Sequence, residues 1–382
     1  MTTLGTTTVP VSGEATFAPA PEELRVAVFS DALPERNGTG AYYHDLIGQL
    51  APRVAEARVL HPRPREGRLR LSLPLPGDSS QRYVPPNLLR IRREMATLRP
   101  HIIVGVTPGP FGLLGARLAR QHGCGFISAF HTHFEGLADL YWGPFGRRFA
   151  IHVLNRINHH LHRQSATVLV NNRDLDPVVR NLGAPAVDLM GTPLERCFLE
   201  AEQPPLPRQL ARVGFAGRLA AEKNIDAILE AALRRPDLQF VIGGDGPLRP
   251  RVEEAAARLE NLDYRGWLER ADLLALMDTI DLLLLPSHQE TFGSVALEAM
   301  ARGRPALVSA SAGIHDWPEL APALFTLHAG DDLATLLEDL REQPDALTAA
   351  AEAAHEAARR LNDRTIEHWL AVLTRHAREG RG

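Results

Sequence analysis

Two glutamates separated by seven residues, Glu290 and Glu298, flank a stretch that suits a ligand carrying both hydroxyl groups and phosphate. A carboxylate accepts hydrogen bonds from a sugar diol. Residues 291–295 lead from a loop into a segment with helical spacing, which predicts unpaired backbone N–H groups and hence an anion site. Taken one at a time, the glutamates have plainer interpretations: a carboxylate that favours a helix dipole and a solvated surface carboxylate.

Two cations lie at a second expected strand-to-helix turn. Arg218 ends a strand expected at residues 212–219, and Lys223 precedes a segment whose apolar residues recur at helical spacing. Two cations at such a turn can bracket a diphosphate. The alternatives are a surface pair and a Schiff-base lysine that holds a pyridoxal cofactor. Lys223 is also the only lysine of the chain, which otherwise uses arginine.

Further candidates follow two strands of the first half of the chain. Gly38 and Gly40 come after a strand expected at residues 24–30, and they permit a phosphate to approach the backbone. His131 follows a strand expected at residues 125–130, where a histidine can hydrogen-bond sugar or acceptor groups. Both signals are weak alone, because turns use glycine and polar residues often end strands.

The elements that must position these residues are expected to be alternating strands and helices. Short apolar runs bounded by turn residues, such as residues 282–285, predict strands of a parallel sheet covered on both faces. Gly244, Asp245 and Gly246 close another strand and permit close approach to a base or ribose. Ligands of such sheets bind where loops leave the carboxyl ends of the strands. The expected fold class is therefore α/β.

Two motifs resemble those of the retaining glycosyltransferases of group 1 and family 4. The His-Thr-x-Phe segment at residues 131–134 resembles that of members that glycosylate lipids. Residues 290–301 match Glu-Thr-Phe-Gly-x-Val-x-Leu-Glu-Ala-Met-Ala, and residues 217–224 match Gly-Arg-Leu-x-x-x-Lys-Asn. The resemblance implies two facing Rossmann-like domains with parallel sheets, the GT-B architecture, and a donor site in the interdomain cleft. It also implies transfer of a hexose from a nucleotide-diphosphate sugar with retention of configuration.

The resemblance further implies roles for single residues. Arg218 and Lys223 would stabilise the leaving diphosphate, Glu290 would hold sugar hydroxyls and Glu298 the ribose. The departing phosphate would act as base, so no protein nucleophile is expected, and neither a metal ion nor a cofactor beyond the donor is expected. The implied catalytic residues are Arg218, Lys223, Glu290 and His131, and the implied donor-binding residues are Gly38, Gly40, Gly244, Asp245, Gly246, Phe292, Gly293, Ser294, Val295 and Glu298.

The chain is expected to divide into two domains after a disordered tail. The expected parts are a tail at residues 1–21, an N-terminal acceptor domain at 22–195 completed by a crossover helix at 364–382, and a C-terminal nucleotide-sugar domain at 196–363. Helices are expected at 346–361 and 366–377. The family usually shows Val-Asp where this chain has Thr192 and Pro193, so the donor contacts of that corner stay open.

The cysteine content and the length of the apolar runs limit the classes of protein to which this chain can belong. The only two cysteines, Cys124 and Cys197, argue against a disulfide scaffold and a zinc cluster, and they favour a reducing compartment. No apolar run approaches the length of a membrane span, and the N-terminus lacks the pattern of a signal peptide. A cytoplasmic location is expected, including a peripheral position on the inner face of the membrane.

The stretch from Arg53 to Arg99 is strongly basic, with 11 arginines against 4 acidic residues. It contains a Pro-rich segment, expected to be an irregular loop, in which Leu71, Leu73 and Leu75 alternate with other residues. This pattern predicts either contact with an anionic membrane surface or a solvated face. A membrane lipid or lipid-linked glycan is the favoured acceptor, with a soluble glycoside or small alcohol as the alternative; nucleic acid is not an expected partner.

Two other functions stay open at this stage. One is a catalytically silent nucleotide-sugar-binding partner protein, and the other is a sugar-nucleotide epimerase of similar architecture. The presence of every motif cation and carboxylate favours the transferase.

Overall fold

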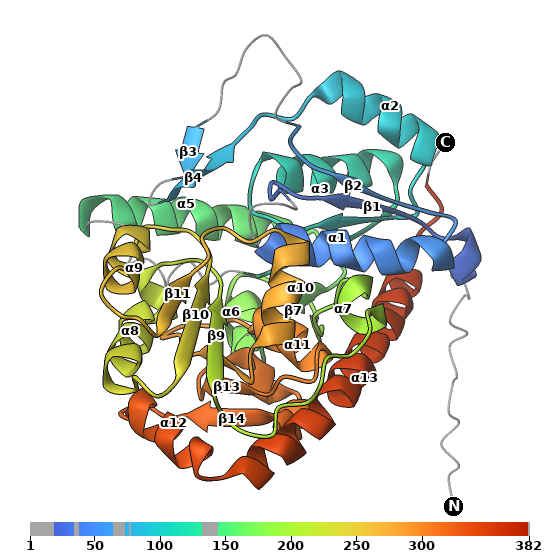
Figure 1. The fold of residues 1–382 in the computed structure, drawn as a ribbon. Helices are drawn as coiled ribbons and strands as arrows, with labels where there is room; N and C mark the ends of the chain where they lie inside the picture. Colours follow the sequence, from blue (N-terminus) through green and yellow to red (C-terminus); the bar gives the residue numbers. More distant parts are fainter. Residues whose placement is uncertain (1–18, 34–37, 64–72, 76–77, 132–143, 381–382) are drawn as a thin grey trace, which may run out of the picture.

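The computed structural model describes residues 19–33, 38–63, 73–75, 78–131 and 144–380. These residues form two six-stranded sheets with helices packed around each, joined by a long C-terminal helix (Figure 1). The expected α/β fold with two parallel sheets is confirmed. Most of the segment expected to be a disordered tail lies outside the described residues.

The first sheet is parallel throughout. Its order is β2 (Glu56–Leu60), β1 (Arg25–Phe29), β5 (Ile102–Gly105), β6 (Gly125–Ala129), β7 (Val168–Val170) and β8 (Val187–Leu189). The helices of this domain are α1 (Gly38–Leu50), α2 (Leu88–Leu98), α3 (Pro110–His122), α5 (Pro144–His162) and α6 (Leu175–Asn181). All residues of β5 and β6 are buried, as expected for parallel strands covered on both faces.

The second sheet repeats the arrangement. Its order is β11 (Leu262–Tyr264), β10 (Gln239–Gly243), β9 (Arg212–Ala216), β12 (Leu282–Leu285), β13 (Ala306–Ser309) and β14 (Leu324–Leu327), all parallel. Its helices are α7 (Arg196–Glu200), α8 (Ile225–Arg234), α9 (Arg249–Ala256), α10 (Arg270–Thr279), α11 (Ser294–Ala301) and α12 (Leu333–Arg341). The run of four leucines is β12, buried along its whole length.

Two features of the first domain differ from the expectations. The Pro-rich segment is not wholly irregular, because β3 (Leu73–Leu75) and β4 (Asp78–Tyr83) pair as an antiparallel hairpin. Residues 64–72 of that segment, among them Leu71, lie outside the described residues. Helix α3 was not predicted from the sequence, although Pro110 at its first position and Gly123 just beyond it are residue types that begin and end helices.

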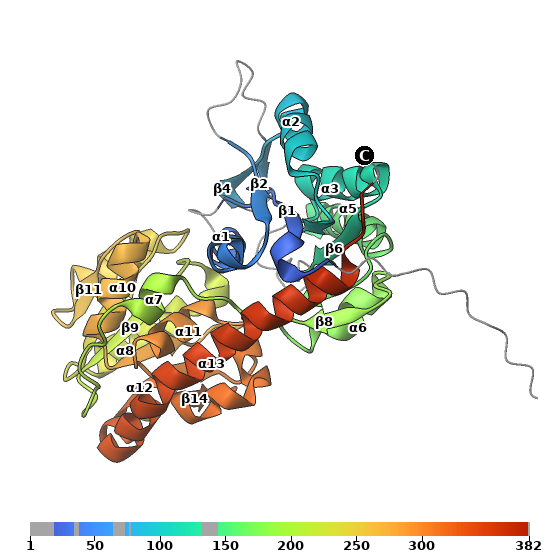
Figure 2. The ribbon, with the colours of Figure 1, turned by 90° about the vertical axis from the view of Figure 1, so that its right-hand side faces the viewer.

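The C-terminal helices expected at 346–361 and 366–377 are one helix, α13 (Pro344–His376), of 33 residues. Figure 2 shows it running from the second domain to the first. Leu347 and Leu361 belong to the apolar core of the second domain, whereas Ile366 and Trp369 belong to that of the first. Asn362 lies between these two sets and is 1% exposed, so a polar residue from the gap between the two expected helices is buried within α13.

Candidate active site

The order of the second sheet identifies the edge at which ligands of open parallel sheets generally bind. From β9 the chain proceeds to β10 and β11 on one side, and from β12 to β13 and β14 on the other, so the direction reverses between β9 and β12. In open parallel sheets, loops at the carboxyl ends of such neighbouring strands separate and leave room for ligands. Lys223 follows β9 and Glu290 follows β12, which brings these two side chains to the reversal point.

Lys223 and Glu290 form an ion pair there. Lys223 Nζ lies 2.5 Å from Glu290 Oε2, and Ser287 Oγ lies 3.4 Å from the same oxygen. The two side chains are 20% and 13% exposed, so the pair is largely shielded from solvent. The backbone N–H of His288 donates to the carbonyl of Glu222 at 2.8 Å, which fixes the loop of Glu290 against that of Lys223. Residues 67 positions apart in sequence are thus joined in one site.

The helix that follows Glu290 begins at the expected place. Gly293 has φ of 104°, a conformation that favours glycine, and a Cβ added to it would lie 2.9 Å from a side-chain atom of Leu285. Ser294 and Val295 begin α11, an eight-residue helix whose first N–H groups have no partner within the helix. Phe292 is buried and its ring meets Trp317 edge-on, so its side chain supports the turn from the core side.

The glycine turn after β10 packs directly against the turn after β9. Gly244 has φ of 137°, and a Cβ there would lie 1.8 Å from the carbonyl oxygen of Gly217, so only glycine fits. The backbone N–H of Leu219 donates to the carbonyl of Asp245 at 3.0 Å, and the Asp245 side chain accepts from the N–H of Gly246 at 2.8 Å. This contact holds the turn that carries Arg218.

Arg218 has a nearby carboxylate of its own. Its Nη1 lies 3.9 Å from Glu222 Oε1, and its side chain is 29% exposed. The side chain of Glu222 is 9% exposed, so Arg218 is the more accessible of the two groups.

Glu298 is held by an arginine that the sequence analysis missed. Arg270, the first residue of α10, donates from Nη1 to Glu298 Oε1 at 2.6 Å. Burial raises the pKa of Glu298, while Arg270 acts in the opposite direction. The available signal was a cation shortly after the strand Leu262–Tyr264, but local sequence does not show that α10 packs beside α11.

His131 is placed by α1 of the same domain. Tyr43 Oη lies 3.0 Å from His131 Nε2, and the rings of Tyr42 and Tyr43 both pack against the imidazole. Burial lowers the pKa of His131 to about 4, so the ring is neutral near pH 7. Gly38 and Gly40 form the first turn of α1, with Gly40 buried.

Asp31 and Thr107 lie at the reversal point of the first sheet, between β1 and β5, and the sequence analysis missed both. Thr107 Oγ1 donates to Asp31 Oδ2 at 2.5 Å, and the N–H of Phe111 donates to Asp31 Oδ1 at 3.1 Å. Burial raises the pKa of Asp31 to about 6. The available signal was that each residue closely follows an apolar strand.

No group of three or more histidine, cysteine, aspartate or glutamate side chains with metal-binding geometry occurs among the described residues. Asp174 and Asp176 form an Asp-x-Asp triplet, a pattern that binds metals in some transferases. Asp176, however, pairs with Arg180 one turn along α6.

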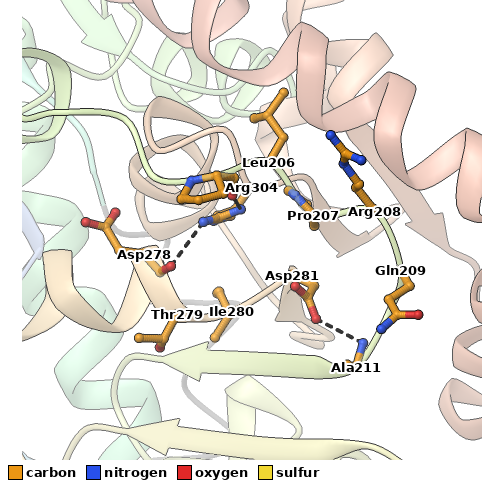
Figure 3. Close-up of a pocket in the computed structure, with 11 residues that line it drawn as sticks. Leu206, Pro207, Arg208, Gln209, Ala211, Asp278, Thr279, Ile280, Asp281 and Arg304 are labelled. Atoms are coloured by element: carbon orange, nitrogen blue, oxygen red, sulfur yellow. Dashed lines mark hydrogen bonds between the residues drawn. The ribbon is translucent and has the colours of Figure 1, made fainter.

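A cavity of about 580 Å³ lies elsewhere in the second domain (Figure 3). Ala211 and Asp281, at the amino ends of β9 and β12, line it, and the Ala211 N–H donates to Asp281 Oδ2 at 2.9 Å. Arg304 Nη2 donates to the carbonyl of Asp278 at 3.0 Å. The cavity is at the opposite end of the strands from Lys223 and Glu290, so it is not part of the candidate site.

Comparison with known proteins places these motifs in a family. Residues 199–357 match the model of the glycosyl transferases group 1, and residues 36–190 match that of glycosyltransferase family 4. A GDP-mannose-dependent alpha-(1-6)-phosphatidylinositol dimannoside mannosyltransferase of Mycobacterium tuberculosis is 30% identical over 263 residues, which cover 65% of this chain and 68% of that protein.

Solved structures share the fold. Sucrose-phosphate synthase from Thermosynechococcus elongatus has a TM-score of 0.72 at 16% identity and covers 92% of this chain and 98% of its own. Anabaena HepE in complex with UDP-glucose has a TM-score of 0.65 at 17% identity and covers 91% of this chain and 98% of its own. With a family 4 domain followed by a group 1 domain on two parallel sheets, the chain belongs to the glycosyltransferases of GT-B architecture.

Proposed function

We propose that the protein transfers a hexose from a nucleotide-diphosphate sugar to an acceptor hydroxyl with retention of configuration and without a metal ion. The observation that carries this proposal is the Lys223–Glu290 pair at the reversal point of the second sheet, beside the N-terminus of α11. Cations and helix amides bind a diphosphate, and a carboxylate binds sugar hydroxyls, so one edge of the sheet offers groups for both parts of the donor.

In the proposed reaction, the bond between the anomeric carbon and the diphosphate oxygen breaks, and its electron pair stays on that oxygen. The acceptor hydroxyl attacks the anomeric carbon from the same face, and its proton passes to the departing phosphate. Arg218, Lys223 and the first N–H groups of α11 stabilise the negative charge that develops on the leaving group. These groups take the electrostatic role that a divalent ion has in metal-dependent transferases.

His131 has a separate role in this proposal. Because its pKa is about 4, the imidazole is neutral at physiological pH and acts as a hydrogen-bonding group toward the transferred sugar. Contact with Tyr43 fixes the orientation of the ring.

We also propose that the acceptor is a membrane lipid or lipid-linked glycan. One support is the exposed face of α2, on which Leu89, 69% exposed, is followed one turn later by the exposed residues Arg92 and Arg93. Apolar and basic side chains on one helix face suit an anionic membrane surface. The other support is the phosphatidylinositol dimannoside acceptor named for the mycobacterial relative. No helix within the described residues has the length and apolar character needed to cross a membrane.

An acceptor-dependence experiment tests the transfer. A thermal-shift screen of nucleotide sugars, including GDP-mannose and UDP-glucose, identifies the donor, since a bound ligand raises the melting temperature. Purified protein is then incubated with that donor, with and without membrane lipid extract, and release of nucleoside diphosphate is measured. The proposal requires release that depends on acceptor and an α-linked product, shown by NMR, from an α-linked donor.

The other outcomes identify the alternatives. Donor binding without release would indicate a silent partner protein, and conversion of the donor without acceptor would indicate an epimerase. A product of inverted configuration would contradict the proposed retention of configuration but not the proposed transfer. For the acceptor class, wild-type protein should sediment with anionic but not neutral vesicles at low salt, whereas Leu89→Ser/Arg92→Gln/Arg93→Gln should stay in solution. Equal behaviour of both proteins would leave the soluble acceptor as the better explanation.

A further inference from the structure

Arg270 joins three carboxylates that come from three separate parts of the fold. Its Nε donates to Glu195 Oε2 at 2.5 Å, its Nη1 to Glu298 Oε1 at 2.6 Å and its Nη2 to Asp45 Oδ2 at 2.6 Å. Glu298 is on α11 of the second domain, Glu195 immediately precedes α7, and Asp45 is on α1 of the first domain. Every nitrogen of the guanidinium therefore has a carboxylate partner.

The cluster contains three carboxyl groups and one guanidinium, so its acidic groups outnumber its basic one. The side chains of Asp45 and Glu298 are 5% and 11% exposed, so little water is available to solvate them. Burial, opposed by Arg270, raises the pKa of Asp45 to about 7, with Glu298 and Glu195 also contributing to the rise. Because a guanidinium is a rigid, planar fork, it fixes the direction of each carboxylate that it binds as well as compensating its charge.

We propose that Arg270 is a positioning residue of the donor site: it orients Glu298 toward the ribose of the nucleotide and, through Asp45, makes that orientation depend on contact between the two domains. The inference rests on the proposed function, in which Glu298 binds ribose hydroxyls. Arg270 itself acts through Glu298. By linkage, ribose binding and contact between α1 and α10 favour one another.

A second contact between the domains provides a control. The backbone N–H of Arg173, which lies between β7 and α6, donates to Asp316 Oδ2 at 2.7 Å in the second domain. This contact involves neither Arg270 nor Glu298. Asp316→Asn thus weakens an interdomain hydrogen bond without altering the charge around the ribose carboxylate.

The test compares nucleoside diphosphates that differ only in the ribose. Isothermal titration with GDP, 2′-deoxy-GDP, UDP and 2′-deoxy-UDP gives, for the preferred base, the ratio of the two Kd values. Wild-type protein should prefer the ribonucleotide about tenfold, the effect of a hydrogen bond to a charged group. Arg270→Gln should reduce the ratio to about one, and Arg270→Lys, which keeps the charge but not the fork, should leave an intermediate ratio.

The coupling to the first domain is tested in the same measurement. Asp45→Asn should lower the ratio, but it should have no further effect in the Arg270→Gln background, because the two residues act through one path. Asp316→Asn should keep the wild-type ratio. Circular dichroism and melting temperatures establish whether each variant is folded. If Arg270→Gln does not fold, Arg270→Lys tests the proposal.

Three results would overturn the inference. Equal weakening of both nucleotides in the Arg270 variants, with the ratio preserved, would assign Arg270 a structural role only. A loss of ratio in Asp316→Asn equal to that in Asp45→Asn would show general loosening of the domains. If wild-type protein bound both nucleotides equally, Glu298 would not contact the ribose, but the proposed transfer would still stand. Absence of nucleotide binding in wild-type protein is a separate outcome and would contradict the proposed function itself.

Discussion

Asn362 Oδ1 accepts a hydrogen bond from the backbone N–H of Leu194 at 2.9 Å, at the point where both connections between the domains pass. Asn362 lies in the middle of α13, and Leu194 lies between β8 and α7. Gln49, on α1, donates to the same side-chain oxygen at 2.8 Å and to the carbonyl of Leu194 at 2.6 Å. One buried amide therefore ties the two connections to each other and to the first domain.

Replacing Asn362 should destabilise the protein. Asn362→Ala leaves two groups without their partner, the buried N–H of Leu194 and Gln49 Oε1, which accepts from Asn362 Nδ2 at 2.9 Å, at a cost of about 2 kcal/mol or more. Urea unfolding followed by circular dichroism measures the change. The matched control is the next residue, Asp363→Ala, since Asp363 is exposed and should change stability by less than about 0.5 kcal/mol. Similar losses in the two variants would show that the buried network contributes little.

Removing either site cation should slow transfer. Arg218→Ala and Lys223→Met each lose a charge that, in the proposed reaction, stabilises the leaving diphosphate, so the rate of nucleoside diphosphate release should fall by about 10²-fold or more. Arg258→Gln serves as control, because Arg258 lies in the exposed turn just after α9, where it pairs with Glu254, and this variant should keep the wild-type rate. Full activity in either site variant would exclude that residue from the site.

Glu290→Gln should separate donor binding from turnover. The amide keeps the shape of the side chain but loses the charge that pairs with Lys223 and that, in the proposed function, binds sugar hydroxyls. Nucleoside diphosphate should still bind within about tenfold of the wild-type Kd, while turnover falls by about 10²-fold. Unchanged turnover would contradict the assignment of Glu290.

Gly293→Ala should disturb the start of α11. At φ of 104° an alanine is strained, and its Cβ would lie 2.9 Å from Leu285, so a loss of about 1–3 kcal/mol in stability is expected. Gly266→Ala is a matched control, because Gly266 also has positive φ but a Cβ there meets no atom within 4 Å. Donor binding, measured by titration, should weaken in Gly293→Ala and persist in Gly266→Ala. Equal donor affinity in both variants would show that the α11 N-terminus does not bind the donor.

The raised pKa of Asp45 gives a pH dependence of stability. The folded-state pKa is about 7 against an ordinary value of 3.8, so the folded protein binds a proton more tightly than the unfolded chain between these values. The contribution that protonated Asp45 makes to the stability of the folded protein is fully present below pH 3.8 and is lost as pH rises to about 7. The free energy of unfolding, measured with urea from pH 5 to 8, should therefore fall less in Asp45→Asn than in wild type. If the two proteins gave parallel curves of this free energy against pH, the raised pKa would be contradicted.

The sequence by itself determined the local elements and the main candidate residues. Apolar runs such as β12 and β5 can be satisfied only by burial on both faces, which predicts parallel strands and an α/β fold. The start of α11 at Ser294 was equally predictable, because the apolar residues take up helical spacing there. Lys223 was noticeable as the only lysine, and Glu290 by its spacing from Glu298.

The tertiary structure decided what each of these residues meets. Lys223 and Glu290 come together because β9 and β12 are neighbours in the sheet, and strand order is not encoded in local periodicity. The same holds for Asp31 with Thr107 across β1 and β5. Asn362 falls in the gap between the two helices expected at 346–361 and 366–377, whereas α13 continues through it. Its burial against Leu194 depends on two domains that local sequence does not place, and so does the position of Arg270 among three carboxylates.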